Sequence, residues 1–160
     1  MAQSWKPNDW ETLITGARCP VCDLIATAQQ QDKHLRPIAD MRFSRLFLAK
    51  NQYVPGYCVL ICHRHVIEPH ELTAEERALF FDDVSVAGQV LQAAFTADKM
   101  NYNILGNVVP HLHVHIIPRY FTDSAPHRPI DPTPQGYEVY LTAAAYVERI
   151  TLIQQHLEAR

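Results

Sequence analysis

The sequence predicts a single α+β domain with a mostly antiparallel sheet, one long helix, N-terminal helices and a C-terminal helix. Segments with helical and strand periodicity follow one another in no strict βαβ order, which favours an antiparallel sheet. The 160 residues suffice for one hydrophobic core, and a composition of 48% hydrophobic and 19% charged residues is typical of globular proteins. We expect the core over residues 42–120, an N-terminal helical segment over 1–36, and a C-terminal loop and helix over 121–160.

Two helices are expected before the core. Residues 9–15 predict a short helix that ends at Gly16. A second helix is predicted to begin at Pro20, because proline is favoured in the first helical turn, and its apolar residues recur at helical spacing to residue 28. Pro37 would prevent this helix from continuing.

Strand patterns and one long helix make up the first part of the core. Residues 43–50 have strand periodicity, and a turn-forming stretch separates them from the nearly all-apolar strand 57–62. Thr73 and Glu76 have the spacing of a capping box, which predicts an amphipathic helix that reaches about Asp98.

The second half of the chain continues with two strands, a loop and a helix. Residues 102–105 and 111–119 predict strands, joined by a turn at 106–110. Several prolines predict a loop over 121–136, and residues 138–159 have the pattern of a terminal helix.

Three histidines alternate with apolar residues in the strand 111–119. His111, His113 and His115 would therefore share one face of the strand, about 7 Å apart, while the residues between them enter the core. Imidazoles are close to neutral at pH 7 and can serve as ligands, bases or nucleophiles. The pattern leaves three alternatives open: a metal site, a histidine nucleophile with two supporting imidazoles, or a hydrogen-bonded polar face.

Cys19 and Cys22 have the spacing of half a zinc site. A buried pair of thiols and a redox pair are the alternatives. If zinc binds, imidazoles or the remaining cysteines, Cys58 and Cys62, would complete the site. Disulfides are improbable in the cytoplasmic location that we expect, where thiols stay reduced.

Charge and hydropathy limit the possible partners. A formal net charge of −3 argues against general binding to nucleic-acid polymers or anionic membranes. The apolar runs are too short to span a bilayer, and the first ten residues contain no apolar signal region. We therefore expect no membrane or nucleic-acid partner, and no organic cofactor.

Residues 43–119 resemble the histidine triad (HIT) superfamily, in particular its dinucleoside polyphosphate hydrolases. The matching motifs are Val54-Pro55-Gly56 between two strands, Glu71-Leu72-Thr73 before the long helix, Gly106-Asn107-Val108-Val109-Pro110, and the stretch from His111 to Arg119. The resemblance implies that His113 attacks the α-phosphorus of a nucleotide to form a nucleotidyl-histidine, which water or another acceptor then releases. A phosphoramidate hydrolase or nucleotidyl transferase would use the same nucleophile, and a non-catalytic nucleotide- or zinc-binding module is an alternative of another class.

The resemblance also assigns the supporting residues. A backbone carbonyl would hold the second nitrogen of His113, while His115 and Asn107 would contact phosphate oxygens. His111 completes the triad. Apart from the resemblance, we expect Leu46 to form a wall for a base and Arg119 to supply positive charge near a polyphosphate tail, because it follows the triad in sequence. The full set of predicted substrate contacts is Asn107, Gly106, Asn51, Leu46 and Arg119.

Two positions depart from the pattern of these hydrolases. Tyr57 follows the Pro-Gly turn where they have a histidine, and Ala49 replaces an asparagine that touches the sugar, with Asn51 two residues away. The departures concern the ribose contacts and the preferred substrate.

The resemblance further implies a five-stranded, mostly antiparallel sheet, a bound metal and an assembly. A structural zinc would be held by Cys19, Cys22, His65 and His111, with His63 as the neighbouring competitor for His65. The chain would form a homodimer that extends the sheet across two copies. Diadenosine tetraphosphate or a similar dinucleoside polyphosphate is the expected substrate.

Overall fold

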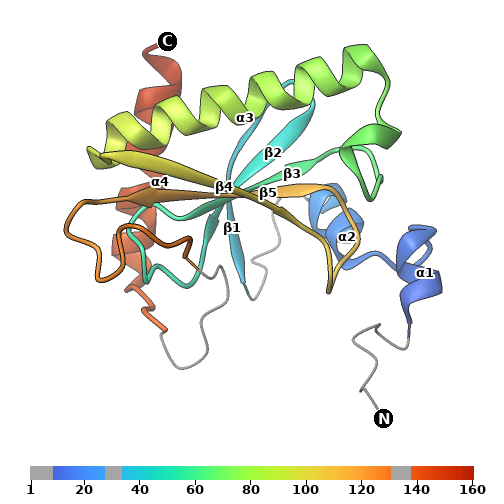
Figure 1. Cartoon of the computed structure of the whole chain (residues 1–160), viewed down its shortest axis with the longest axis horizontal. Coiled ribbons are helices and arrows are strands. Elements are labelled where there is room, and N and C mark those ends of the chain that lie inside the picture. Colours follow the sequence, from blue (N-terminus) through green and yellow to red (C-terminus); the bar gives the residue numbers. More distant parts are fainter. Residues whose placement is uncertain (1–8, 28–33, 131–137) are drawn as a thin grey trace.

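The computed structural model describes residues 9–27, 34–130 and 138–160 (Figure 1). In chain order the elements are α1 (Trp10–Ile14), α2 (Pro20–Ala26), β1 (Leu35–Asp40), β2 (Ser44–Ala49), β3 (Cys58–Cys62), η1 (Pro69–Glu71), α3 (Ala74–Phe95), β4 (Lys99–Leu105), β5 (His113–Arg119) and α4 (Ala143–Glu158). The fold is α+β, as the sequence predicts. Within the described ranges, no helix is long and apolar enough to cross a membrane.

The five strands form one sheet in the order β1-β2-β3-β5-β4, and every neighbouring pair is antiparallel. Helix α3 lies across one face of the sheet (Figure 1). Helix α4 contacts α3 and β1, whereas α1 and α2 lie at the other end of the view. The strand that carries His113 and His115 is therefore second from one edge, between β3 and β4.

Alternation along the strands creates two cores. Residues such as Leu46, Leu60 and Val114 pack toward α3 and α4 in the larger core. Their neighbours Phe47 and Ile61 belong to a smaller core on the opposite face, where side chains of α2 pack against them. Because successive side chains of a strand point to opposite faces, the sheet separates the α3 side from the histidine side.

Strand β1 completes the sheet at a place where the sequence pattern indicates no strand. Leu35 pairs with Ala49 and Asp40 with Arg45, with a register shift between Pro37 and Ala39. Proline lacks a backbone donor and is tolerated at sheet edges and at bulges. Pro37 therefore lies in an edge strand here, although it had been expected only to end a helix.

Three other boundaries differ from the predicted ones. Helix α3 ends at Phe95, before a left-handed Thr96 with φ 49°, and β4 begins earlier than expected, at Lys99. Helix α4 starts at Ala143, because the side chain of Thr142 accepts a hydrogen bond from the Ala145 backbone and caps the helix. Residues 121–130 contain no helix or strand, and the rest of the predicted loop, 131–136, lies outside the described residues.

Candidate active site and metal centre

A cavity of about 430 Å³ opens on the histidine face of the sheet. His113 and His115 of β5 line it beside Val59 and Ile61 of β3. The pairing places Val59 opposite His115 and Ile61 opposite His113, so the apolar wall and the imidazoles are adjacent. The other lining residues are Val21, His34, Leu35, Ala49, Lys50, Asn51, Tyr57, Val109, Glu138 and Tyr140.

His113 is held by a backbone carbonyl. Its Nδ1 donates to the carbonyl oxygen of His111 at 2.6 Å, which leaves the lone pair on Nε2. Burial lowers the pKa of His113, and the carbonyl contact partly opposes this shift. The ring is therefore neutral near pH 7, with an unprotonated nitrogen at the cavity, which is the state that a nucleophile requires.

His115 is the second imidazole of the cavity. Its ring centroid lies 5.0 Å from that of His113, at an interplanar angle of 74°. Its Nδ1 lies 2.6 Å from the Tyr57 hydroxyl. Burial, with a smaller contribution from His113, lowers the pKa of His115 to about 4, so this ring is also neutral at pH 7.

His111 precedes β5 and does not line the cavity, whereas the strand pattern predicts one row of three histidines. Strand β5 begins only at His113, and the His111 side chain has no exposed surface. Its Nε2 donates to the carbonyl oxygen of Cys62 at 2.8 Å. The backbone carbonyl of His111 contacts His113, while its imidazole faces a separate cluster.

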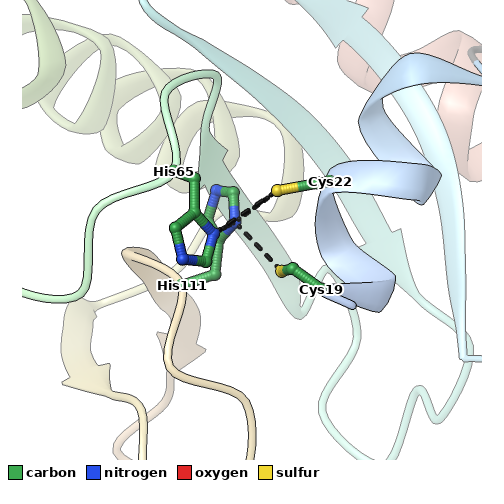
Figure 2. A group of neighbouring side chains, drawn as sticks. All are labelled: Cys19, Cys22, His65 and His111. Atoms are coloured by element: carbon green, nitrogen blue, oxygen red, sulfur yellow. Dashed lines mark hydrogen bonds between the residues drawn. The ribbon is translucent and has the colours of Figure 1, made fainter. Parts of the chain in front are cut away.

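That cluster consists of Cys19, Cys22, His65 and His111 (Figure 2). The sulfur of Cys19 lies 3.5 Å from Nδ1 of His111, and the sulfur of Cys22 lies 3.4 Å from Nδ1 of His65 and 3.6 Å from that of His111. The two Nδ1 atoms are 3.2 Å apart. All four ligand atoms lie within 4.8 Å of one another, so the cluster can hold a metal ion.

The hydrogen bonds of the two imidazoles fit a bound cation. Nε2 of His65 lies 3.1 Å from the Ile14 carbonyl oxygen. Nε2 of His111 likewise contacts the Cys62 carbonyl oxygen. Carbonyl oxygens only accept, so both Nε2 atoms carry the proton and both Nδ1 lone pairs face each other. A tetrahedral zinc with bonds of about 2.05 Å to nitrogen and 2.3 Å to sulfur separates its ligand atoms by about 3.3–3.8 Å. The nitrogen–nitrogen distance of 3.2 Å and the nitrogen–sulfur distances of 3.4–3.6 Å are close to this geometry.

Local sequence explains how the cluster assembles. Cys19 and Cys22 flank the first turn of α2, which Pro20 begins. Gly16 has φ +76°, and a Cβ there would lie 3.1 Å from the His65 ring, so glycine allows the N-terminal segment to approach His65. The competitor His63 lies elsewhere, with Nε2 3.4 Å from a carboxylate oxygen of Asp40.

Three of the predicted substrate contacts lie at or near the cavity. Asn51 lines it, and its Oδ1 accepts from the backbone N–H groups of Tyr53 and Val139. Gly106 and Asn107 follow Leu105, the residue that pairs with His113. Neither residue lines the cavity. Asn107 is exposed, and Val109 of the same loop forms part of the cavity wall.

Leu46 and Arg119 need correction as substrate contacts. Leu46 is fully buried on the α3 side of the sheet. Successive side chains of β2 point to opposite faces, and that of Leu46 points away from the cavity. Arg119 is 5% exposed and lines a separate cavity of about 390 Å³. It donates to the Asp123 carboxylate at 2.7 Å, to the side chain of Asn101, and to the backbone carbonyls of residues 125 and 128, so it holds that loop in place.

Sequence reasoning missed most of the cavity wall. Val59 and Ile61 belong to a strand that is apolar throughout, so alternation could not reveal which residues face the histidines. Lys50 and Tyr140 line the same cavity although they lie far from each other in the sequence. Tyr57 and Ala49 carried a signal in the sequence, as the two departures from the hydrolase pattern.

The chain belongs to the HIT domain family, whose model matches residues 28–122. Bis(5'-nucleosyl)-tetraphosphatase (asymmetrical) of Schizosaccharomyces pombe is 34% identical over 87 residues, which are 51% of this chain and 48% of that protein. Bis(5'-adenosyl)-triphosphatase of Saccharomyces cerevisiae is 34% identical over 73 residues, or 42% and 35% of the two chains. The chain thus matches half or less of the length of these curated relatives.

Solved structures show the same fold. A histidine triad protein from Bradyrhizobium japonicum has a TM-score of 0.70 and 26% identity, covering 81% of this chain and 98% of its own. A zinc-bound histidine triad family protein from Mycobacterium smegmatis has a TM-score of 0.59 and 20% identity, covering 89% and 95%. The five-stranded sheet with its long helix is therefore a HIT fold.

Proposed function

We propose that this protein hydrolyses a nucleotide phosphoanhydride through a nucleotidyl-histidine intermediate, with a dinucleoside polyphosphate such as diadenosine tetraphosphate as substrate. The observation that carries the proposal is the hydrogen bond from Nδ1 of His113 to the His111 carbonyl, which leaves a nucleophilic nitrogen at the cavity. The names of the two yeast relatives support this substrate class.

Each residue has a role in two steps. Nε2 of His113 attacks the α-phosphorus, and the bond from this phosphorus to the bridging oxygen breaks, so that the remaining nucleotide leaves. Water then attacks the same phosphorus and the bond to Nε2 breaks. His115 and Asn107 donate hydrogen bonds to phosphate oxygens as charge develops, while Val59 and Ile61 supply an apolar wall for a base.

The experiment is covalent trapping. Protein is mixed with radiolabelled diadenosine tetraphosphate and denatured, and an acid-labile, base-stable label on His113 is expected. His113→Ala should carry no label, whereas His63→Ala, outside the cavity, should be labelled like the wild type. A protein that binds the nucleotide without labelling or turnover would instead be a binding module.

The leaving group is a separate question. A panel of dinucleoside tri- and tetraphosphates, nucleoside phosphoramidates and sugar nucleotides, with and without an acceptor, ranks the alternatives. Hydrolysis of polyphosphates with the highest kcat/KM supports the proposal. A preference for amidates, or transfer to the acceptor, would assign the chain to the phosphoramidate hydrolases or nucleotidyl transferases.

We also propose that the cysteine–histidine cluster binds a structural zinc ion. Its donor set of two sulfurs and two imidazoles suits zinc, and the hydrogen-bonded Nε2 atoms orient both rings. Bound there, zinc would crosslink α2 to the segment that precedes β5. Metal analysis of protein purified without chelator should give one zinc per chain, and a chain without stoichiometric metal would contradict the assignment.

Finally, we propose a homodimer formed through the edge of β4. In the described part of the chain β4 pairs only with β5, and it exposes apolar side chains, among them Tyr102 at 46%, Ile104 at 39% and Leu105 at 42%. An unpaired, apolar strand edge favours pairing with a second copy. Sedimentation should give a dimer for the wild type and a monomer for Ile104→Arg; a wild-type monomer at micromolar concentration would refute the proposal.

A further inference from the structure

Tyr57 contacts the second histidine of the cavity. Its hydroxyl oxygen lies 2.6 Å from Nδ1 of His115, and the two ring centroids are 5.9 Å apart. Tyr57 is 4% exposed and lines the same cavity as His113. The tyrosine therefore determines the surroundings of one nitrogen of His115.

The backbone and ring of Tyr57 are held in place. Its N–H donates to the Val54 carbonyl at 3.1 Å, and its own carbonyl accepts from the Ala49 N–H at 3.0 Å and from the Gln52 side chain at 2.9 Å. The Tyr53 ring packs edge-on against it, with centroids 5.7 Å apart. The hydroxyl is thus placed by a rigid turn, so the contact with His115 does not depend on a mobile side chain.

Two proton arrangements fit this pair, because a tyrosine hydroxyl both donates and accepts. A tyrosine hydroxyl ordinarily keeps its proton at neutral pH, and His115 is neutral because burial lowers its pKa to about 4. A neutral imidazole has one N–H and one lone pair. When the hydroxyl donates to Nδ1, the N–H of His115 must be on Nε2.

The choice of tautomer matters for phosphate. Oxygens of an ionised phosphate only accept hydrogen bonds, so the imidazole needs a donor directed at them. The Nε2–H form of His115 provides this donor. The opposite form, with Nδ1–H donating to the tyrosine oxygen, would place a lone pair against the phosphate charge.

We propose that Tyr57 is a positioning residue that fixes His115 in the Nε2–H form, so that His115 donates to the phosphoryl group while it transfers to His113. The inference rests on the proposed function, because only transfer to His113 gives the donor its use. Tyr57 touches no reacting atom and acts through His115.

The variant that tests the proposal is Tyr57→Phe, which removes one oxygen and keeps the ring. Tyr53→Phe is the matched control, because it removes a hydroxyl from the neighbouring ring, which does not line the cavity. Nitrogen NMR of the zinc-loaded protein should show His115 as Nε2–H in the wild type and in Tyr53→Phe, and a mixture of tautomers in Tyr57→Phe.

Kinetics provides the second measurement. In single turnovers, Tyr57→Phe should form the nucleotidyl-histidine about tenfold more slowly, the effect of one ordinary hydrogen bond, with the label still on His113 and KM little changed. Tyr53→Phe should keep the wild-type rate.

Three results would overturn the proposal: an Nδ1–H tautomer in the wild type, a Tyr57→Phe protein with unchanged tautomer and rate, or an equal loss in the Tyr53→Phe control. Because the wild-type spectrum alone can refute it, the test does not depend on how well the variant folds. A wild-type chain that forms no nucleotidyl-histidine would refute the proposed function instead, and the spectrum would still decide the tautomer.

Discussion

Replacing His65 by alanine is the sharpest perturbation of the metal centre. His65 contributes one of four ligand atoms that lie within 4.8 Å of one another before any ion is added. Since an ion that binds only the folded chain stabilises it, zinc at about 1,000 times its dissociation constant should add about 4 kcal/mol to the free energy of unfolding. For a chain of this length about 1 kcal/mol corresponds to about 2–4 °C, so we expect zinc to raise the Tm by about 8–16 °C.

The variant should lose most of this gain. If the missing ligand weakens binding about a thousandfold, the same zinc concentration adds only about 0.4 kcal/mol, or about 1–2 °C. The assay is calorimetry of wild type and variant, each with buffered zinc and with chelator. Comparing each protein with itself removes the cost of losing the His65 contact to the Ile14 carbonyl, which is the same in both conditions.

His63→Ala is the control, because this imidazole is two residues away and faces Asp40. It should show the full wild-type response to zinc. A wild-type Tm that does not respond to zinc, or a His65→Ala protein that responds as strongly as the wild type, would refute the four-ligand site.

Further predictions concern catalysis and stability. His113→Ala should lower kcat by about 10⁴-fold or more and Asn107→Ala by about 10²-fold, and equal mild losses in steady-state assays would contradict a covalent role for His113. Because the pKa of His115 falls from 6.5 to about 4 on folding, the unfolded chain binds an extra proton between these pH values. The free energy of unfolding should therefore decrease as the pH falls through this range, by at most about 3 kcal/mol for this residue, and His115→Gln should reduce the pH dependence in urea titrations. Asp83 is buried and accepts from two backbone N–H groups and a serine hydroxyl, so Asp83→Ala should cost about 3 kcal/mol or more in urea unfolding. Exposed Asp82 serves as its control, with an expected cost of about 1 kcal/mol or less; equal losses would contradict this role of Asp83.

Some parts of the fold could be predicted because their signals are local. The capping box at Thr73 starts α3 through hydrogen bonds within four residues, and the strand periods of β2 and β5 reflect burial on their own faces. The edge strand β1 could not be located, since Pro37 is unfavourable locally and is tolerated only because β2 supplies a partner on one side.

Local patterns are enough to identify the reactive groups of this chain: two cysteines at metal-ligand spacing, three alternating histidines, and periodicity typical of one α+β domain. The division of these groups between a metal centre and a cavity follows from the tertiary contacts. His111 precedes the first residue of β5. Its ring lies beside Cys19 and Cys22, while its backbone carbonyl orients His113. Such divisions depend on strand register and on contacts between residues 43 and 92 positions apart, which local spacing does not encode.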